Sequence, residues 1–146
     1  LKTPRTEEFV DTEKFATLRA LPFFSDFTDV EIWEALRFAD WKHVVPGTTI
    51  MRDGEPGNFF CFVADGTVAV SKNGTRLTTL TSSECFGEMA IIDHSPRSLT
   101  AVALEPSEVA VINERDFLFL VHETPTFALQ VMRTLTERIR QIGPRS

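Results

Sequence analysis

The stretch that decides the fold spans residues 84–103 and reads ECFGEMAIIDHSPRSLTAVA. Gly87 and the Glu-Met-Ala run after it favour a short helical turn over a strand. The N-terminus of such a turn presents unpaired backbone N–H groups, which favour an anion. Arg97 follows, and its guanidinium offers a fork of donors suited to phosphate oxygens. The stretch therefore predicts a phosphate-bearing ligand, with Glu88 accepting from a sugar hydroxyl; the alternative is a structural ion pair between Glu88 and Arg97.

The chain after Trp41 reads as short strands rich in Val, Thr, Ile and Phe. The sequences VPGT, RDGEPGN, ADGT and KNGT separate them as turns. In KNGT, Asn73-Gly74 suits a type I′ turn, in which both central residues need positive φ. We therefore expect a hairpin between residues 67–71 and 75–80.

A second hairpin is predicted between residues 99–104 and 109–113, turning through EPSE. Several short strands at this spacing favour a closed antiparallel roll over a parallel sheet. The predicted fold class is therefore mostly β with flanking helices, an antiparallel β-roll similar to a double-stranded jelly roll.

Both ends of the chain read as helical. Near the N-terminus, Thr28 and Glu31 form a capping box that begins the second of two short helices. After Glu114 the helical period returns, with a break at Pro125, and GPRS ends the last helix. The apolar positions that define these helices are Phe15, Leu18, Leu21, Val30, Ile32, Trp33 and Leu36 in the first pair and Phe127, Val131, Leu135 and Ile139 in the last helix.

The length fits one domain with a single sizeable core. We expect that domain to span residues 1–146 as N-terminal helices (1–40), a β-roll (41–113) containing the anion-binding segment (86–98), and C-terminal helices (114–142).

Composition excludes several classes of protein. Lys and Arg number 15 against 21 Asp and Glu, and the net charge of −6 argues against nonspecific attraction to nucleic acid or an anionic membrane. The chain has no run of 18 apolar residues and no leader, so we expect a cytoplasmic protein.

The chain begins at Leu1 rather than Met, and we expect it to be part of a longer protein whose output domain is missing here. Cys61 and Cys85 are expected to be free thiols in the core.

The sequence offers no catalytic or metal-binding pattern. His43, His94 and His122 are too widely spaced for a metal site. Neither G-x-x-x-x-G-K-[ST] nor G-x-G-x-x-G occurs, which excludes nucleotide binding through a P-loop or a Rossmann turn. We therefore predict that the chain is not an enzyme, binds no metal and has no cofactor.

The pattern FGEMAII…PRSLTAV resembles the phosphate-binding cassette of the cyclic nucleotide-binding domain family, of the cyclic AMP receptor protein and protein kinase A regulatory subunit type. The likeness covers nearly the whole chain, because PGTTIMRDGEPGNFFCFVADGTVAV also matches the family's glycine-punctuated strands. The glycines concerned are Gly47, Gly54, Gly57 and Gly66.

The resemblance implies how the phosphate would be held. Arg97 would pair with the exocyclic oxygens of the cyclic phosphate, and Gly87 would let the backbone approach the ligand. Backbone N–H groups near Met89 and Ala90 would complete the phosphate cradle, and Ser98 would add its hydroxyl or its amide.

The resemblance also implies contacts to the sugar and the base. Glu88 would accept from the ribose 2′-hydroxyl, and Thr78 would contribute to the wall that faces the base. Two positions depart from the family: Leu99 stands where a small residue is usual, and Ser83 where a glycine is usual. Leu99 either points into the core or crowds the pocket. In receptor-type members the last helix supplies a lid over the base, and here we expect that helix to end at Ile142.

The function that the resemblance implies is a noncatalytic sensor of cyclic AMP or cyclic GMP whose ligand shifts the terminal helices. The alternative is a degenerate member that serves as an interaction module and dimerises through the apolar face of the last helix. Receptor-type members add a helix-turn-helix after that helix, so we expect no DNA binding by this chain alone.

Overall fold

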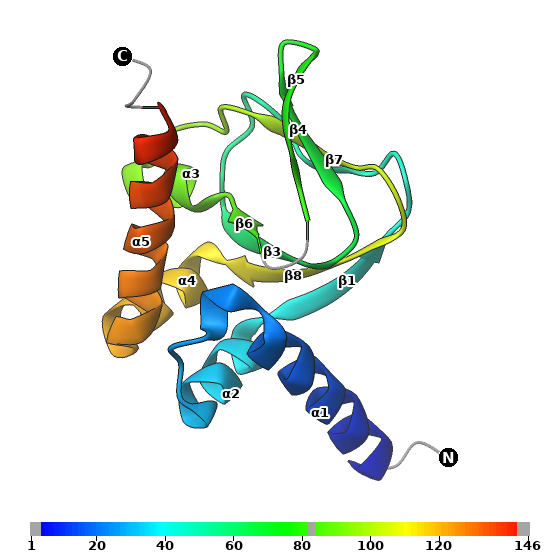
Figure 1. Ribbon diagram of the computed structural model, residues 1–146, viewed down its shortest axis with the longest axis vertical. Coiled ribbons are helices and arrows are strands. Elements are labelled where there is room, and N and C mark those ends of the chain that lie inside the picture. The colour runs from blue at the N-terminus through cyan, green and yellow to red at the C-terminus, as the bar shows by residue number, and fades with distance from the viewer. Residues whose placement is uncertain (1–3, 82–83, 143–146) are drawn as a thin grey trace.

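The computed structural model describes residues 4–81 and 84–142. Two four-stranded sheets form a β-roll, and most of the helices gather at one end of it (Figure 1). The sequence predictions that concern Ser83 and the GPRS sequence at 143–146 lie outside the described residues.

Every strand pair in both sheets is antiparallel. The first sheet has the order β1 (Asp40–Val44), β8 (Ser107–Asn113), β3 (Phe59–Asp65), β6 (Cys85–Phe86). The second has the order β2 (Thr49–Met51), β7 (Thr100–Ala103), β4 (Val68–Lys72), β5 (Thr75–Leu80). The predicted antiparallel β-roll is therefore confirmed.

The hairpin of β4 and β5 turns as predicted. Asn73 and Gly74 have φ values of 52° and 81°, and Lys72 pairs with Thr75 on either side of them. Positive φ at both central positions is what a type I′ turn requires.

The second predicted hairpin is wrong. β7 and β8 both form, but β7 pairs with β2 and β4, whereas β8 pairs with β1 and β3. The chain crosses between the sheets after Ala103 because the crossing segment bonds to the β3–β4 turn. Leu104 N–H donates to Thr67 O at 2.9 Å, and Thr67 N–H donates to Ser107 Oγ at 3.2 Å. Gly66 permits this approach, since a Cβ there would lie 2.2 Å from Ser107 Oγ.

The central strand β3 is buried on both faces because it separates two apolar clusters, which explains its continuous apolar sequence. Phe60 and Phe62 belong to the cluster on the helix side, and Cys61 and Val63 belong to the cluster inside the roll. Cys85 belongs to the helix-side cluster, and both thiols are free and buried as predicted. The roll-interior cluster consists of Met51, Cys61, Val63, Val68, Val70, Leu80, Phe86, Ala101 and Val109.

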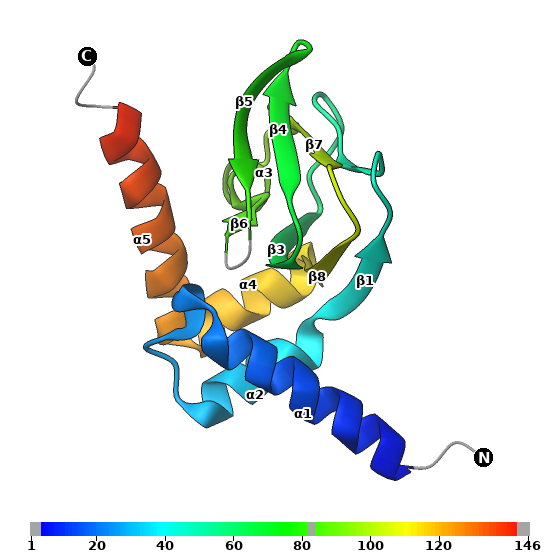
Figure 2. The same cartoon turned by 45° about the vertical axis from the view of Figure 1, so that its right-hand side comes forward.

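The N-terminal helices include the capping box that the sequence predicts. Thr28 Oγ1 accepts from Glu31 N–H, and Glu31 Oε1 accepts from Thr28 N–H. Leu18 and Ile32 are buried, but Val30 is 74% exposed and does not belong to the apolar face. The first half of α1 projects away from the roll (Figure 2). The N-terminal helices are α1 (Pro4–Ala20), the short 3₁₀ helix η1 (Pro22–Phe24) and α2 (Asp29–Phe38).

The C-terminal helices are α4 (Glu114–Glu123) and α5 (Pro125–Ile142). On α5, Phe127 and Val131 are buried in the helix-side cluster, whereas Ile139 is 67% exposed. The predicted apolar face is therefore core only in the first half of the helix. None of the helices in the described part of the chain combines the length and the hydropathy that a membrane span requires.

Candidate functional site

The segment between β6 and β7 contains a short helix, α3 (Glu88–Asp93), as its sequence predicts. Gly87 is the N-cap residue of this helix, and its φ of 97° lies in the left-handed region. A Cβ at this position would lie 2.9 Å from both the Phe59 carbonyl oxygen and Arg97 Nη1. Only glycine therefore fits where the chain leaves the sheet and enters α3.

The Arg97 side chain is buried, with 4% of the residue exposed. Its Nη1 donates to Gly87 O at 2.8 Å and its Nη2 donates to Phe59 O at 2.6 Å, while the guanidinium carbon lies 4.8 Å from the centre of the Phe59 ring. Burial lowers the pKa of Arg97 from its ordinary value, and the negative charge of Glu88 opposes that shift. An arginine remains charged at neutral pH, so the site holds a buried cation.

The Arg97 backbone is fixed by the loop between β2 and β3. Arg97 N–H donates to Glu55 O at 2.8 Å, and Gly54 N–H donates to Arg97 O at 2.7 Å. Gly57 in the same loop has no space for a side chain, since a Cβ would lie 2.3 Å from Ala90 Cβ and 3.0 Å from Arg97 Cζ. The loop therefore positions Arg97 and α3 against each other.

Glu88 is buried, with 1% of the residue exposed, and its carboxylate is held from α5. Arg138 Nη1 donates to Glu88 Oε1, and Arg138 Nη2 donates to Cys85 O. Glu88 Oε2 is buried and has no hydrogen-bond partner among the described residues. The ion pair of Glu88 is therefore with Arg138, and no ion pair between Glu88 and Arg97 occurs in the described part of the chain.

The sequence analysis missed Arg138. A signal for it exists, because Arg138 lies two helical turns after Val131 and therefore on the side of α5 that is buried nearer its start. A charged residue that continues a buried face is unusual, and it indicates a partner on the surface that the face covers.

The remaining predicted residues lie as follows. Met89 is exposed, Ala90 is buried, and the Gly87 N-cap makes no side-chain hydrogen bond to the first turn of α3. Ser98 is exposed, and its carbonyl accepts from Lys72 Nζ at 3.0 Å. Thr78 is exposed on β5 at the edge of the second sheet, and none of the contacts within the described ranges joins it to Arg97 or Glu88. The structure thus brings together Gly87, Glu88, Met89, Ala90, Arg97 and Ser98, with Thr78 apart from them.

Leu99, the position where the sequence departs from the family, is partly buried and packs against the roll-interior cluster. Of the two alternatives for this side chain, the structure shows contact with the core.

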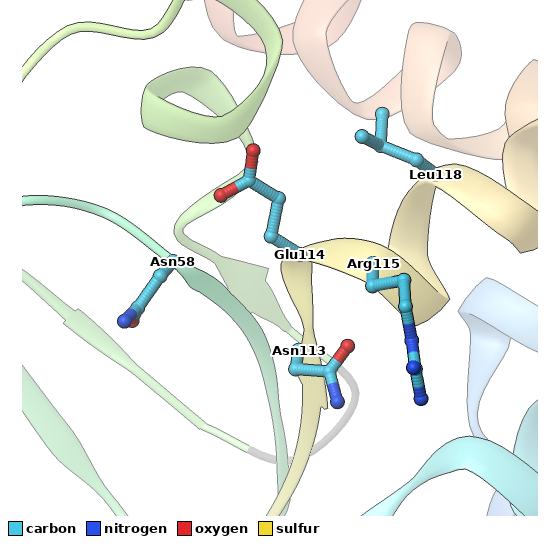
Figure 3. A pocket seen from close by; sticks show the side chains of 5 residues that line it. All are labelled: Asn58, Asn113, Glu114, Arg115 and Leu118. Carbon is cyan, nitrogen blue, oxygen red and sulfur yellow. The ribbon is translucent and has the colours of Figure 1, made fainter.

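One hollow lies at the end of β8, and another lies beside α3. The larger, of about 530 Å³, lies where β8 meets α4 and is lined by Asn58, Asn113, Glu114, Arg115 and Leu118. Figure 3 shows the Glu114 side chain extending toward α3. The other hollow, of about 260 Å³, lies over Gly57 and Ala90. Neither is lined by Glu88 or Arg97.

The model of the family described as "Cyclic nucleotide-binding domain" matches residues 41–124, more than half of the chain. The protein therefore belongs to the cyclic nucleotide-binding domain family. It is 28% identical over 129 residues to the cyclic AMP receptor protein of Thermus thermophilus, covering 85% of this chain and 60% of that protein. It is 32% identical over 119 residues to a cyclic nucleotide-gated potassium channel of Mesorhizobium japonicum, covering 82% of this chain and 33% of the channel.

Solved structures agree with this assignment. The catabolite activator protein of Thermus thermophilus superposes with a TM-score of 0.78 at 29% identity, covering 85% of this chain and 61% of that one. The regulatory domain of Toxoplasma gondii protein kinase A, crystallised with cyclic AMP, superposes with a TM-score of 0.77 at 20% identity, covering 87% of this chain and 50% of that one. The second likeness shows the fold alone.

Proposed function

We propose that the chain is a noncatalytic sensor domain that binds a 3′,5′-cyclic nucleotide, cyclic AMP or cyclic GMP, between α3 and Arg97. The observation that carries the proposal is that Glu88 Oε2 is buried without a hydrogen-bond partner among the described residues, in the same segment as the buried guanidinium of Arg97. The Glu88 carboxylate can accept a hydrogen bond from a ligand, and the Arg97 guanidinium can bind an anion. A ribose with a cyclic phosphate supplies both within one small molecule.

Arg97 is suited to the phosphate because only part of its donor set is used. A guanidinium has five N–H donors, and Arg97 directs two of them at the carbonyls of Gly87 and Phe59. In this proposal the remaining N–H groups bond to phosphate oxygens. In this proposal the N–H groups near Met89 and Ala90 and the hydroxyl or amide of Ser98 complete the phosphate contacts.

Glu88 is suited to the sugar because a buried carboxylate oxygen without a donor is costly. A ribose 2′-hydroxyl would donate to Oε2 while Oε1 keeps its bond to Arg138. Thr78, on β5, would lie on the side of the base. The family relatives named for cyclic AMP and cyclic nucleotides support this ligand class.

The same carboxylate would couple the ligand to the terminal helices. Arg138 joins α5 to Glu88, so a ligand on Oε2 changes the group to which α5 is bonded. A ligand can shift α5 only by its differential affinity for two positions of the helix. In this proposal the output lies outside the chain, since the chain spans 60% and 33% of the two curated relatives.

The test is isothermal titration calorimetry, in which the wild type and the Arg97→Lys variant are each titrated with cyclic AMP and with cyclic GMP. Lysine keeps the charge and has three N–H donors, but it loses the planar fork that pairs with two phosphate oxygens, so we expect affinity to fall on the order of tenfold. Arg97→Ala is less suitable because it also strips the Gly87 and Phe59 carbonyls of their donor. Unchanged affinity in Arg97→Lys would refute the assignment of Arg97 to the phosphate.

A second candidate function is an interaction module that dimerises through α5. Of the face predicted for dimerisation, Phe127, Val131, Leu135 and Ile139, the first two residues are buried in the core, so a partner would contact the later part of α5 at Ile139 and the neighbouring Met132. Met132 is 56% exposed and Ile139 is 67% exposed, although both are apolar. Sedimentation equilibrium of the wild type and of Ile139→Lys tests this candidate, which predicts association by the wild type only.

A further inference from the structure

Lys72, the last residue of β4, reaches the segment that follows Arg97. Its Nζ donates to Ser98 O at 3.0 Å and lies 3.7 Å from Asp53 Oδ2. Asp53 is placed by its own backbone, because its N–H donates to Thr100 Oγ1 at 3.0 Å. The ammonium is therefore bonded to a backbone carbonyl beside Arg97, and the carboxylate balances its charge from farther away.

Two successive peptide units after Arg97 have their carbonyls bonded to protein donors. Arg97 O accepts from Gly54 N–H at 2.7 Å, and Ser98 O accepts from Lys72. In a trans peptide the N–H and the C=O point in opposite directions. The N–H of Ser98 therefore points away from Gly54, and the N–H of Leu99 points away from Lys72. The orientation of both peptides is fixed by these two bonds.

Two acidic residues near this segment are in ion pairs, whereas the buried arginine has no such partner in the described part of the chain. Glu88 is paired with Arg138, and Asp53 is paired with Lys72. Arg97 forms no ion pair within residues 4–81 and 84–142. The segment therefore holds one buried cation without a counter-ion among the described residues, Arg97, and next to it the ammonium bonded to Ser98.

We propose that Lys72 is a positioning residue for the phosphate end of the ligand. Its bond to Ser98 O fixes the Ser98–Leu99 peptide, and together with the Gly54 bond to Arg97 O it holds Ser98 between two oriented peptides. Ser98 then serves the phosphate from a fixed backbone, and Lys72 adds positive charge beside Arg97. The inference rests on the proposed function and extends it to a residue on the second sheet, far from α3 in the sequence. What distinguishes Lys72 from an ordinary strand-end lysine is that its shorter contact is with the carbonyl rather than with the carboxylate.

The experiment compares three variants of the full chain by titration with cyclic AMP and cyclic GMP. Lys72→Met removes the donor and the charge, and Lys72→Arg restores both. Lys42→Met is the matched control, because Lys42 is 54% exposed on β1 and lies 3.4 Å from Asp40, whereas Lys72 is 48% exposed. We expect Lys72→Met to lose affinity on the order of tenfold, and Lys72→Arg and Lys42→Met to bind as the wild type does.

One further measurement completes the test. The amide resonances of Ser98 and Leu99 in the ligand-free protein should shift in Lys72→Met and stay in place in Lys42→Met. If the wild type binds a cyclic nucleotide and Lys72→Met binds it with the same affinity, this inference is overturned and the proposed function stands. The same holds if Lys42→Met loses as much affinity as Lys72→Met. A wild type that binds neither nucleotide would overturn the proposed function and this inference with it.

Discussion

Arg138, near the end of α5, donates to the carboxylate of Glu88, the first residue of α3, and to the carbonyl of Cys85. The Glu88 side chain is 1% exposed and the Arg138 side chain 36% exposed. Water reaches the guanidinium but not the carboxylate, so the loss of this ion pair would cost more at Glu88 than at Arg138. The contact joins the C-terminal helix to the carboxylate that we assign to the ribose.

Arg138→Ala should lower the free energy of unfolding by about 1–3 kcal/mol, because it leaves a buried carboxylate without its cation. The matched control is Arg140→Ala, which removes an exposed arginine from the same helix and should change stability by less than about 0.5 kcal/mol. Urea unfolding measures both. Equal losses in the two variants would show that Arg138 contributes no more than a surface charge.

Glu88→Gln tests the contact to the sugar. We expect the wild type to bind a cyclic nucleotide on the order of tenfold more tightly than its 2′-deoxy analogue, and Glu88→Gln to lose most of that preference, since a neutral amide is the weaker acceptor. Glu84→Gln, in which the changed carboxylate accepts from Thr81 outside the site, is the control. A preference that survives in Glu88→Gln would remove Glu88 from the ribose.

Glu31 predicts a dependence on pH. The Thr28 backbone N–H lowers the pKa of Glu31 from its ordinary value, and the Thr126 hydroxyl bonded at 2.9 Å acts in the same direction. A lowered pKa in the folded state stabilises the protein above the unfolded pKa of about 4.3, and that contribution is lost as pH falls toward the folded pKa.

Glu31→Ala should therefore cost about 0.5–1 kcal/mol at pH 7, as expected for loss of a helix cap, and the difference from the wild type should shrink below about pH 4. Thermal unfolding at several pH values measures this. Glu34→Ala, on the same helix, serves as the control. A difference that is constant with pH would show that the carboxylate charge does not matter.

Gly57→Ala should destabilise the protein by about 1–3 kcal/mol, since the new methyl group would meet Ala90 Cβ at 2.3 Å. Combining it with Ala90→Gly removes the atom that it meets. We therefore expect the double variant to be more stable than the sum of the two single changes predicts, by thermal unfolding. Strict additivity would show that the two sites do not interact.

Local signals in the sequence predicted local structure well. The Asn73-Gly74 turn, the Thr28–Glu31 capping box and the start of α3 at Gly87 were confirmed because each depends on residues next to it. The crossing between β7 and β8 was missed because a short polar turn does not reveal whether the next strand stays in the same sheet.

The site was predicted in part for the same reason. Glu88 and Arg97 stand out within one short stretch, but their partners come from distant segments: Arg138 from α5 and Phe59 from β3. The helical period places Arg138 on the side of α5 that is buried nearer its start, but it does not identify the group that Arg138 contacts. The same limit applies to Lys72, whose contact with Ser98 depends on the pairing of β4 with β7.

The measurement that tests the central claim most directly is the thermal midpoint of the protein with excess cyclic AMP, cyclic GMP or linear 5′-AMP. A ligand at about 100 times its dissociation constant adds roughly 2.7 kcal/mol, which raises the midpoint of a domain this size by several degrees. We predict that shift with at least one cyclic nucleotide and none with 5′-AMP. No shift with any of the three at millimolar concentration would contradict the sensor assignment and favour the interaction module.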